Sequence, residues 1–385
     1  MKSWPTKKLG EVAEYINGRA FKPTDWGEIG LPIIRIQNLT ETQEKFNYFN
    51  GRVEDRYLVK NGDILLSWSA SLGVYIWNNG DAVLNQHIFK VVPSKDINKS
   101  YLFYALIVAV EELKRRVHGS TMTHVTKPIF NRVTTKIPPL QIQKQIVERL
   151  DKIAEAQKLN GDLIQKTDEL FQSLLHKELN PAGKNWESKK LGDKDVIEII
   201  DGDRGKNYPP KNEFQKTGFC LFLNTKNVTS SGFIFAEVDF IPKERDKKLR
   251  KGKLQRNDIV LTTRGTIGNS ALYDDSVEFD NVRINSGMVI LRPNTKQIIP
   301  KLLWILMGDS MTQKQFKRIL SGTAQPQLPI TNLVKIKIPL PPLETQKQIV
   351  QKLSAVQEYK TGLIEQRKKL KELFESSLHK SMSNK

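Results

Sequence analysis

The segment PPLQIQKQIV at residues 138–147 recurs almost unchanged as PPLETQKQIV at residues 341–350, an offset of 203 residues. The same offset still holds where the following segments end, because His176-Lys177 corresponds to His379-Lys380. Proline interrupts a preceding strand and is tolerated in the first turn of a helix, so each copy predicts a helix start. We therefore expect a tandem duplication of one module, which suggests recognition of a partner with two halves.

A long amphipathic stretch follows each Pro-Pro pair, and we predict helices over residues 141–177 and 344–380. About 37 residues would form a rod of roughly 55 Å, longer than ordinary surface helices. If a pseudo-twofold axis relates the modules, the helices run antiparallel and the chain termini lie close together. The alternative is that each helix packs only on its own module. Apolar residues spaced mostly by three and four positions, or by multiples of these steps, form the predicted seam: Ile146, Leu150, Ile153, Phe171, Ile349, Leu353, Val356, Leu370 and Phe374.

The rest of each module reads as a mixed globular domain. The module start WPTKKLGE at residues 4–11 recurs as WESKKLGD at 186–193, and NGDILL at 61–66 recurs as RNDIVL at 256–261. Short apolar runs between Gly, Asn and Asp predict strands at 32–36, 64–66, 74–77, 88–92, 219–223, 259–261, 270–273 and 288–291, with helices at 100–116 and 300–320. We therefore predict an α+β protein with globular domains at 1–140 and 181–342 and helical segments at 141–180 and 343–385.

The chain has 385 residues, a formal net charge of +19 and a pI of about 9.7. This surplus favours a nucleic acid as partner, because neutralising phosphates releases counterions; the alternative is a protein that is merely basic. The single cysteine, Cys220, excludes an internal disulfide and a multi-cysteine metal site. It fits a reducing compartment, and with no signal peptide evident we expect a cytoplasmic protein.

Signatures of catalysis are missing from the sequence. GDRGK at residues 202–206 has the wrong spacing for a phosphate-binding loop, and NYPP at 207–210 reverses the motif of amino-methyltransferases. The histidines form no H-E-x-x-H motif. We therefore expect a binding protein with no catalytic residue, no metal site and no cofactor of its own.

The repeated motifs resemble those of specificity (S) subunits of Type I restriction–modification systems. The resemblance is carried by DIVLTTRGTIG at residues 258–268, by GDILLSWS at 62–69, by the W-x-x-K-K-L-G module starts and by the PPL…QKQI helix starts. Because these motifs recur in the same order in both halves, the resemblance covers essentially the whole chain.

This resemblance implies that each globular domain is a target recognition domain for half of a split DNA site. It also implies that the long helices form an antiparallel coiled coil that sets the spacing between the half-sites. The family members are non-catalytic and bind two methyltransferase (M) subunits, which methylate adenine with S-adenosylmethionine; where motor-nuclease (R) subunits join, they use ATP and Mg. The differing loops of the domains predict an asymmetric site. The alternative is a free-standing DNA-binding regulator or decoy with the same modules.

Loops at the strand ends are where we expect DNA contacts, since Lys and Arg suit phosphates and Arg, Asn and Gln suit base edges. For Arg264, within the family signature, a structural role is an equal alternative. The charged run at 243–253 is either a solvated helix face or a phosphate-tracking element. The candidates are Arg19, Lys22, Arg35, Gln37, Asn38, Ser67, Ser69, Gln86, His87, Arg115, Arg116, Ser120, Thr121 and Thr123 in module one, and Arg204, Lys206, Asn224, Lys226, Asn227, Thr263, Arg264, Arg283, Asn285, Ser286, Gln325 and Gln327 in module two.

Contacts with partner proteins should involve the long helices. Polar residues such as Gln157, Thr167 and Arg367 interrupt the predicted seam and leave room for another protein. Near the helix starts, we expect the outward faces to carry Gln143, Lys144, Glu148, Gln346, Lys347 and Gln351. An ordinary solvated helix surface would show the same pattern.

Overall fold

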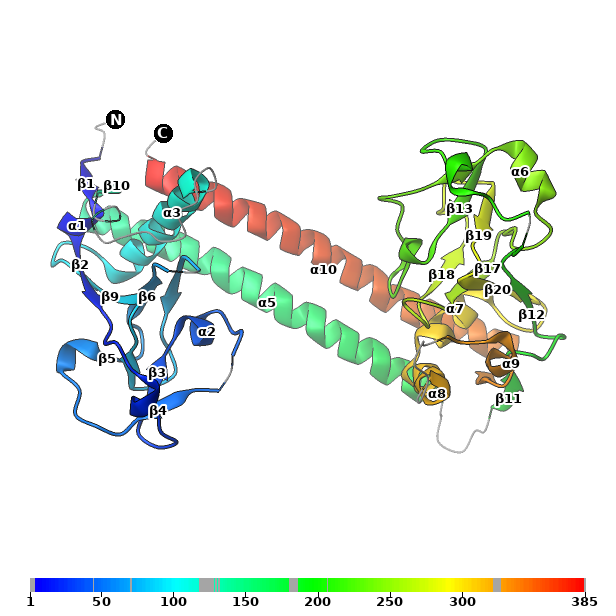
Figure 1. The fold of residues 1–385 in the computed structure, drawn as a ribbon, viewed down its shortest axis with the longest axis horizontal. Coiled ribbons are helices and arrows are strands. Elements are labelled where there is room, and N and C mark those ends of the chain that lie inside the picture. The colour runs from blue at the N-terminus through cyan, green and yellow to red at the C-terminus, as the bar shows by residue number, and fades with distance from the viewer. Residues whose placement is uncertain are drawn as a thin grey trace. The chain divides into compact units, whose positions relative to one another are not determined.

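The computed structural model describes residues 4–43, 45–69, 71–117, 128, 130, 132–179, 186–205, 207–320 and 327–383, without the side chains of residues 116, 117 and 383. The chain divides into two compact units, Met1–Asp162 with Ile364–Lys385 and Leu163–Leu363. The long helices are α5 (Leu140–Leu179) and α10 (Leu343–Ser383) (Figure 1). Each unit therefore contains one globular domain and part of each long helix.

In the described part of the first unit, two four-stranded sheets and one strand pair accompany the helix α3 (Lys99–Val117). The antiparallel sheet β2-β9-β6-β7 consists of β2 (Ala13–Asn17), β9 (Ile88–Pro93), β6 (Ile64–Ser67) and β7 (Gly73–Ile76). The sheet β4-β3-β8-β5 consists of β4 (Asn47–Phe49), β3 (Leu31–Ile34), β8 (Ala82–Leu84) and β5 (Leu58–Val59), with β3 and β8 parallel. β1 (Thr6–Lys8) pairs with β10 (Thr134–Lys136). The helices are α1 (Leu9–Val12), η1 (Pro23–Asp25), α2 (Ile36–Leu39), η2 (Asp55–Tyr57) and α3 (Lys99–Val117).

The second unit repeats this arrangement. The sheet β12-β20-β17-β18 consists of β12 (Ile197–Asp201), β20 (Met288–Pro293), β17 (Asp258–Thr262) and β18 (Ser270–Tyr273). The sheet β16-β13-β19 consists of β16 (Phe240–Ile241), β13 (Cys220–Leu223) and β19 (Val282–Ile284), with β13 and β19 parallel. Two further pairs join β14 (Val228–Thr229) to β15 (Gly232–Phe233) and β11 (Glu187–Lys190) to β21 (Lys337–Leu340). The helices are η3 (Lys211–Glu213), η4 (Thr225–Asn227), α6 (Lys243–Lys248), α7 (Pro300–Gly308), α8 (Ser310–Leu320) and α9 (Ile330–Leu333).

The matching sheet orders confirm the duplication and the α+β class that the sequence predicts. The strands marked by apolar runs appear within a few residues of their predicted positions. The sequence did not predict β1 and β11, which lie within the repeated module starts. These strands are short, rich in lysine and mostly exposed, so no apolar pattern marks them.

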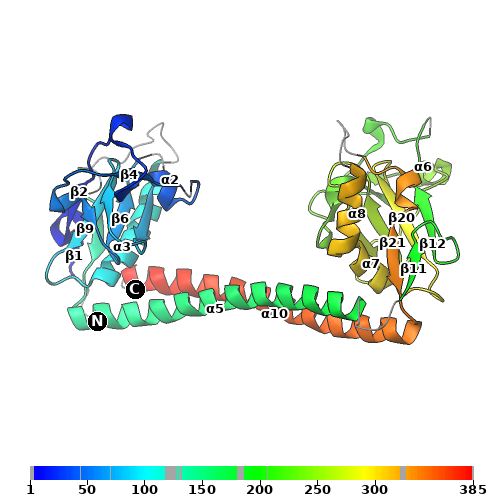
Figure 2. The ribbon, with the colours of Figure 1, turned by 90° about the horizontal axis from the view of Figure 1, so that it is seen from below.

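One predicted helix is wrong. In place of a single helix over residues 300–320, α7 ends at Gly308 and α8 begins at Ser310. Asp309 between them has an extended backbone (φ −66°, ψ 145°), and its carboxylate accepts the N–H of Met311 at 2.9 Å. Aspartate favours this capping position over a helix interior. The apolar periodicity continues across the break, which is why the sequence pattern missed it. Figure 2 shows both helices beside the sheet that contains β20.

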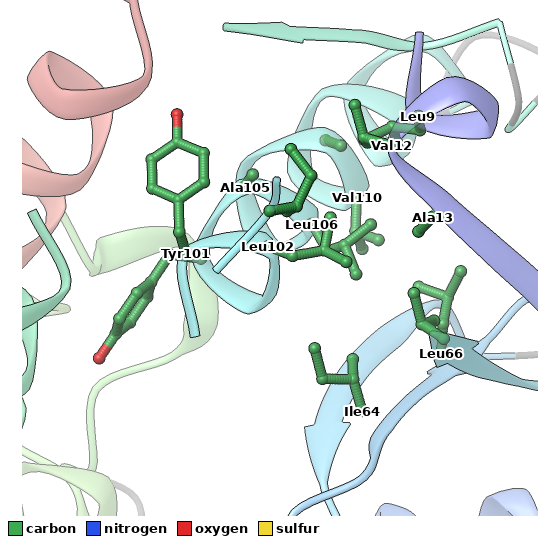
Figure 3. Packing of buried hydrophobic residues seen from close by; sticks show 14 of the residues in the cluster. Leu9, Val12, Ala13, Ile64, Leu66, Tyr101, Leu102, Ala105, Leu106 and Val110 are labelled. Atoms are coloured by element: carbon green, nitrogen blue, oxygen red, sulfur yellow. The ribbon is translucent and has the colours of Figure 1, made fainter. Parts of the chain in front are cut away.

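The main core of the first unit lies between α3 and the sheet β2-β9-β6-β7. Leu102 and Leu106 of α3 pack with Ile64 and Leu66 of β6 (Figure 3). Trp4 near the N-terminus and Met382 near the C-terminus pack against this same core. The predicted closeness of the two termini is therefore confirmed.

The long helices are antiparallel within each unit. In the first, the Gln157 amide donates to the Leu370 carbonyl at 3.1 Å and Asn160 donates to Gln366 at 3.0 Å. In the second, Lys360 pairs with Asp168 and Lys352 pairs with Glu178. Residue numbers rise along α5 as they fall along α10, so the predicted direction is confirmed, and the supercoil itself stays a prediction. Of the predicted seam, Leu150, Ile349 and Leu353 are fully buried and Ile146 nearly so, whereas Ile153, Phe171, Val356, Leu370 and Phe374 are partly buried.

The placement of Gln143 and Gln346 on outward helix faces is wrong, because both side chains are buried. Gln143 accepts the N–H of Asn98 at 2.8 Å and donates to the carbonyls of Pro138 and Asp96 at 2.9 and 3.2 Å. Gln346 makes the matching bonds, with the N–H of Ile299 and with the carbonyls of Pro341 and Gln297, each at 2.8 Å. This repeated glutamine therefore fixes each long helix to its own globular domain.

Candidate nucleic-acid interface

In the second domain, loops from distant parts of the sequence meet at one end of the sheets. The N–H groups of Thr263 and Arg264, after β17, donate to the carbonyl of Gly287 at 2.8 and 3.2 Å. The backbone of Arg264 also forms a bridge with Gln327. The Arg204 guanidinium, after β12, reaches the carbonyl of Ser286 at 3.4 Å. The loops that follow β12, β17 and β19 therefore form one surface, which we call the second loop surface.

η4 joins this surface from the end of β13. The N–H of Asn285 donates to the Leu223 carbonyl at 3.1 Å, beside the start of η4. A Cβ atom added to Gly287 would lie 2.9 Å from the Thr225 side chain. The second loop surface thus brings together the predicted candidates Arg204, Asn224, Lys226, Asn227, Thr263, Arg264, Asn285, Ser286 and Gln327.

The first domain assembles an equivalent surface, the first loop surface. Gln86 donates its N–H to the Arg19 carbonyl at 2.9 Å, and Trp68 donates its N–H to the His87 carbonyl at 3.1 Å. The N–H of Asn85 donates to the carbonyl of Ile34, directly before Arg35, at 3.1 Å. The loops after β2, β3, β6 and β8 therefore meet as their counterparts do in the second domain. Around these contacts lie the candidates Arg19, Lys22, Arg35, Gln37, Asn38, Ser67, Ser69, Gln86 and His87.

A glycine permits the close backbone approach within each surface. A Cβ atom on Gly18 would lie 2.0 Å from the Asn85 carbonyl oxygen, and one on Gly202 would lie 2.2 Å from that of Asn285. Any side chain at either position would push the loop after β2 or β12 away from its neighbour.

Several candidates use their polar atoms to shape these loops. Asn38 accepts the N–H of Arg35 at 3.1 Å and donates to the Gln43 and Lys45 carbonyls at 3.1 and 3.3 Å. Asn227 repeats this pattern, accepting from Asn224 at 3.0 Å and donating to the Ile234 and Glu237 carbonyls at 3.1 and 2.8 Å. These bonds support a structural role for both asparagines.

The hydroxyl groups at the ends of β6 and β17 act in the same way. Ser67 donates to the carbonyl of Ser71, and Thr262, at the matching position, donates to that of Thr266. Ser69 and Thr263 are also buried, at 7% and 6% exposure. Trp68 is stacked on Phe89 at 5.7 Å between ring centroids and packs against the core, which supports a structural role.

The side chain of Arg283 lies inside the second domain, with 6% exposure. It donates to the Asp246 carboxylate at 2.6 Å and to the carbonyls of Lys251 and Leu249 at 2.7 and 3.0 Å. These bonds support a structural role for this candidate as well.

The exposed candidates are those able to meet a ligand. Arg264 is exposed, and its guanidinium has no hydrogen-bond partner among the described residues. In the first loop surface, Arg19 is only partly exposed, and its guanidinium lies over Phe21 and Phe49, with centroids at 5.0 and 4.8 Å, which restricts its direction. The other exposed candidates are Lys22, Gln37, Arg115 near the end of α3, Arg204, Lys226 and Gln327. Lys206, Ser120, Thr121, Thr123 and Gln325 lie outside the described residues, as does the side chain of Arg116.

The charged run at 243–253 also joins the second loop surface. The buried carboxylate of Asp203 accepts the N–H of Arg204 at 2.9 Å and that of Arg250 at 2.6 Å, which ties the turn after α6 to the loop after β12. Burial alone would raise the pKa of Asp203, but these backbone hydrogen bonds outweigh it and the pKa lies below its usual value. The cluster of charge at 243–253 drew attention to this run, but the sequence did not predict its contact with the loop after β12.

Within the described parts of the chain, no group of three or more His, Cys, Asp and Glu side chains is arranged to hold a metal ion. None of the described helices is long and apolar enough to cross a membrane.

Comparison with known proteins identifies the relatives of this fold. The family profile described as "Type I restriction modification DNA specificity domain" matches residues 1–167 and again residues 183–373. The chain is 24% identical over 392 residues to the Type I restriction enzyme EcoBI specificity subunit of Escherichia coli, covering 94% of this chain and 81% of that protein. It is 28% identical over 406 residues to the MjaVIII specificity subunit of Methanocaldococcus jannaschii, covering 99% and 91%.

Two solved structures have a similar fold. The S subunit of the Type I restriction–modification system of M. genitalium matches with a TM-score of 0.58 at 14% identity, covering 98% of this chain and 96% of that one. A chain from a study of complex assembly and conformational transition in the Type I R-M system matches with a TM-score of 0.65 at 19% identity, covering 99% and 98%. At these identities, the likeness concerns the fold.

Proposed function

The chain belongs to the family of Type I restriction modification DNA specificity domains, and from this premise we propose that it is the DNA-binding specificity subunit of a Type I restriction–modification complex. Each globular domain reads one half of a split DNA site. The observation that carries the proposal is the double match of the family profile, at 1–167 and 183–373, because two recognition domains in one chain suit a site with two halves.

The two loop surfaces support an asymmetric site. At matching positions, Ser69 of the first domain corresponds to Arg264 of the second, and Gln37 corresponds to Lys226. Exposed Arg suits guanine, whereas Gln suits adenine, so the two domains offer different chemistry to base edges. A palindromic target would contradict this part of the proposal.

The chain acts without chemistry of its own. Two M subunits dock on it and supply adenine methylation with S-adenosylmethionine, and where R subunits join, they use ATP and Mg. The helix pair sets the number of base pairs between the half-sites, since a stiff spacer holds two readers at a fixed distance. The complex works in the cytoplasm, where the chain meets cellular DNA.

A methylome tests the proposal. The chain is expressed with its M subunit in a host free of DNA methylation, and modified adenines are mapped across the genome. We expect a split, asymmetric motif with a constant gap. Removing one helical turn from each of α5 and α10 should then shift the gap or abolish modification. If no motif is modified while both proteins are soluble and associated, the free-standing DNA-binding regulator becomes the better hypothesis.

A further inference from the structure

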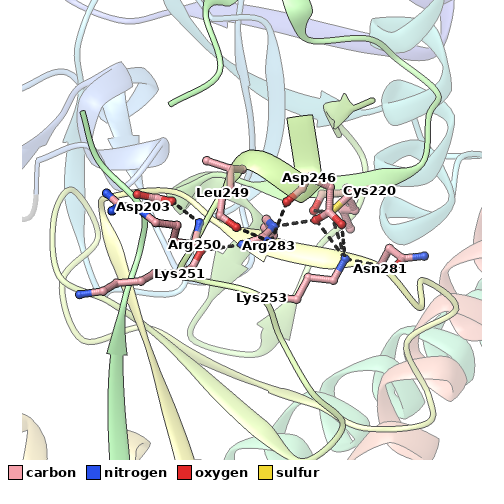
Figure 4. A network of polar contacts seen from close by, with 10 residues as sticks. Asp203, Cys220, Asp246, Leu249, Arg250, Lys251, Lys253, Asn281 and Arg283 are labelled. Atoms are coloured by element: carbon pink, nitrogen blue, oxygen red, sulfur yellow. Dashed lines mark hydrogen bonds and ion pairs between the residues drawn. The ribbon is translucent and has the colours of Figure 1, made fainter. Parts of the chain in front are cut away.

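The charged run at 243–253 has a buried side on which one carboxylate pairs with two cations. Asp246 of α6 accepts hydrogen bonds from Arg283 at 2.6 Å and from Lys253 at 3.0 Å (Figure 4). Burial alone would raise the pKa of Asp246, but these cationic donors outweigh it and the pKa lies below its usual value. Burial also raises the pKa of the neighbouring Cys220 thiol to about 12, so this thiol stays neutral. Asp246 and Arg283 therefore anchor α6 rather than bind a ligand.

The same run also carries four exposed cations. Lys247, Lys248, Arg250 and Lys251 form no ion pair within 4 Å with an acidic residue that the structure describes. Lys248 and Arg250 do lie close enough to Glu213 and Asp203 to help lower the pKa of these carboxyl groups. The side chain of Lys251 extends away from the network around Arg283 (Figure 4). We call these four residues the α6 patch.

The α6 patch borders the second loop surface. The carboxylate of Asp203 holds the N–H of Arg250 at 2.6 Å and also that of Arg204. A Cβ atom on Gly252 would lie 3.3 Å from the Cα of Gly202, so the two turns are in contact. Gly252 has a positive φ of 79°, which favours glycine at this turn. The patch is thus held at a fixed place beside Arg204.

The matching stretch of the first domain lacks this patch. Between β4 and β6 it contains the single-turn helix η2 (Asp55–Tyr57), and there Arg56 pairs with Glu54 at 3.0 Å. Two further cations of this stretch, Arg52 and Lys60, are exposed without an ion pair to a described residue, but they are eight positions apart. A run of four such cations within five positions is therefore a feature of the second domain in this comparison.

We infer that the α6 patch is a phosphate clamp of the second domain, which holds the DNA backbone beside the half-site that the second loop surface reads. Four exposed cations without an ion pair on a fixed edge suit a row of phosphates, which position a duplex without carrying sequence information. The inference rests on the proposed function. It adds that the two domains differ in their contacts with DNA phosphates as well as in their contacts with bases.

The test is the salt dependence of specific DNA binding by the complex with its M subunits. The variant combines Arg250→Gln with Lys251→Gln, which leaves the backbone N–H that Asp203 holds. Loss of two phosphate contacts should lower the slope of log K against log salt by up to about 1.8. Affinity for specific and for random duplexes should fall by the same factor, and the modified motif should not change.

The matched control combines Lys194→Gln with Lys296→Gln. Both are exposed lysines of the same unit, near the opposite end of β12 and β20, about 16 Å of strand away. The control loses the same net charge as the Arg250→Gln, Lys251→Gln variant. If the α6 patch contacts phosphates directly, the slope of log K against log salt should change clearly more in that variant than in the control. Equal slopes in the two variants would overturn the inference. So would weaker association with the M subunits at unchanged DNA binding, because the patch would then be a protein contact. If the unaltered complex binds no specific duplex, the proposed function itself fails.

Discussion

In the first domain, Leu58 of β5 faces Val83 of β8. At the matching bridge of the second domain, Lys253 faces Arg283. The parallel neighbours also match, since Ile33 pairs with Val83 and Phe222 pairs with Arg283. The first domain therefore has apolar side chains at these positions, whereas the second has a buried network of ion pairs that supports α6. The comparison teaches that the same backbone arrangement can contain either apolar residues or ion pairs there, provided that every buried charge has a partner.

The largest expected effect comes from removing the shared carboxylate of that network. Asp246→Leu leaves Arg283 and Lys253 without their acidic partner and should destabilise the second unit by about 3–5 kcal/mol. Hydrogen exchange read by mass spectrometry measures the opening free energy of each unit separately. Asp239→Leu, which breaks the exposed pair with Lys216 in the same unit, should cost less than about 1 kcal/mol.

The same network offers a sharper version of the comparison. Combining Asp246→Leu, Lys253→Leu and Arg283→Val copies the apolar solution of the first domain and removes the unpaired charges. It should recover part of the stability lost in Asp246→Leu, because the carbonyls that Arg283 served still lose their donor. If this triple variant is as unstable as the single one, the two domains are not interchangeable at this position.

A somewhat smaller effect should be shared by both domains. Gln143→Leu and Gln346→Leu each leave a buried N–H and two carbonyls without partners and should each destabilise their own unit by about 3 kcal/mol. Hydrogen exchange again separates the units. The exposed neighbours Gln145→Leu and Gln348→Leu are the controls and should have little effect. A large cost in one unit only would show that the repeated helix starts are not equivalent.

DNA binding should separate the two loop surfaces. Arg264→Ala should weaken binding of the specific duplex by about 1–3 kcal/mol and relax the motif at a position in one half-site, since an exposed Arg reads guanine. Ser69→Ala, at the matching position of the first domain, should leave that half-site unchanged because Ser69 is already buried. Methylome motifs of the two variants check both statements. An unchanged motif for Arg264→Ala, together with lower stability, would favour the structural role of this arginine.

The smallest expected effect is a difference in acid sensitivity between the unaltered second unit and the triple variant that lacks Asp246. The pKa values of Asp203 and Asp246, both in the second unit, lie below their usual value of 3.8 in the folded protein. A lowered folded pKa contributes stability that is complete above the unfolded pKa and is lost as the pH falls through the folded value. The second unit should therefore lose stability on acidification below about pH 4. A pH series of hydrogen exchange tests this, and the triple variant, which lacks Asp246, should lose less.

The repeated segments made much of the fold predictable. Apolar runs around Ile64 and Ile259 marked the central strands, and Pro138-Pro139 and Pro341-Pro342 marked the long helices, because burial and backbone geometry leave local traces. Gly62 and Asn257, at matching positions, both have positive φ, as the turn residues in their motifs suggested. The break at Asp309 was missed because its signal is a single capping residue within a continuing apolar pattern.

The candidate site was predictable as a set of loops. Polar residues after Ile34, Leu66 and Leu84 drew attention to the right segments, since strand ends expose the chain. Their individual roles were not predictable. Asn227 and Arg283 have the side chains of base readers, yet both have structural partners. Asn227 bonds to carbonyls within ten residues of it, whereas Arg283 bonds to the Lys251 carbonyl 32 residues away.

The sequence by itself determined the duplication, the α+β class, the two long helices and the loops that form each surface. These features depend on local periodicity and on repetition, which can be read directly from the linear sequence. Only the tertiary structure decided that Gln143 and Gln346 point inward, that Arg283 is neutralised by Asp246, and that Lys247, Lys248, Arg250 and Lys251 form no ion pair with an acidic residue that the structure describes. Whether a charged or amide side chain stabilises the fold or is free to bind DNA depends on the groups within hydrogen-bond distance of it. Many of these groups belong to residues that are far apart in the sequence.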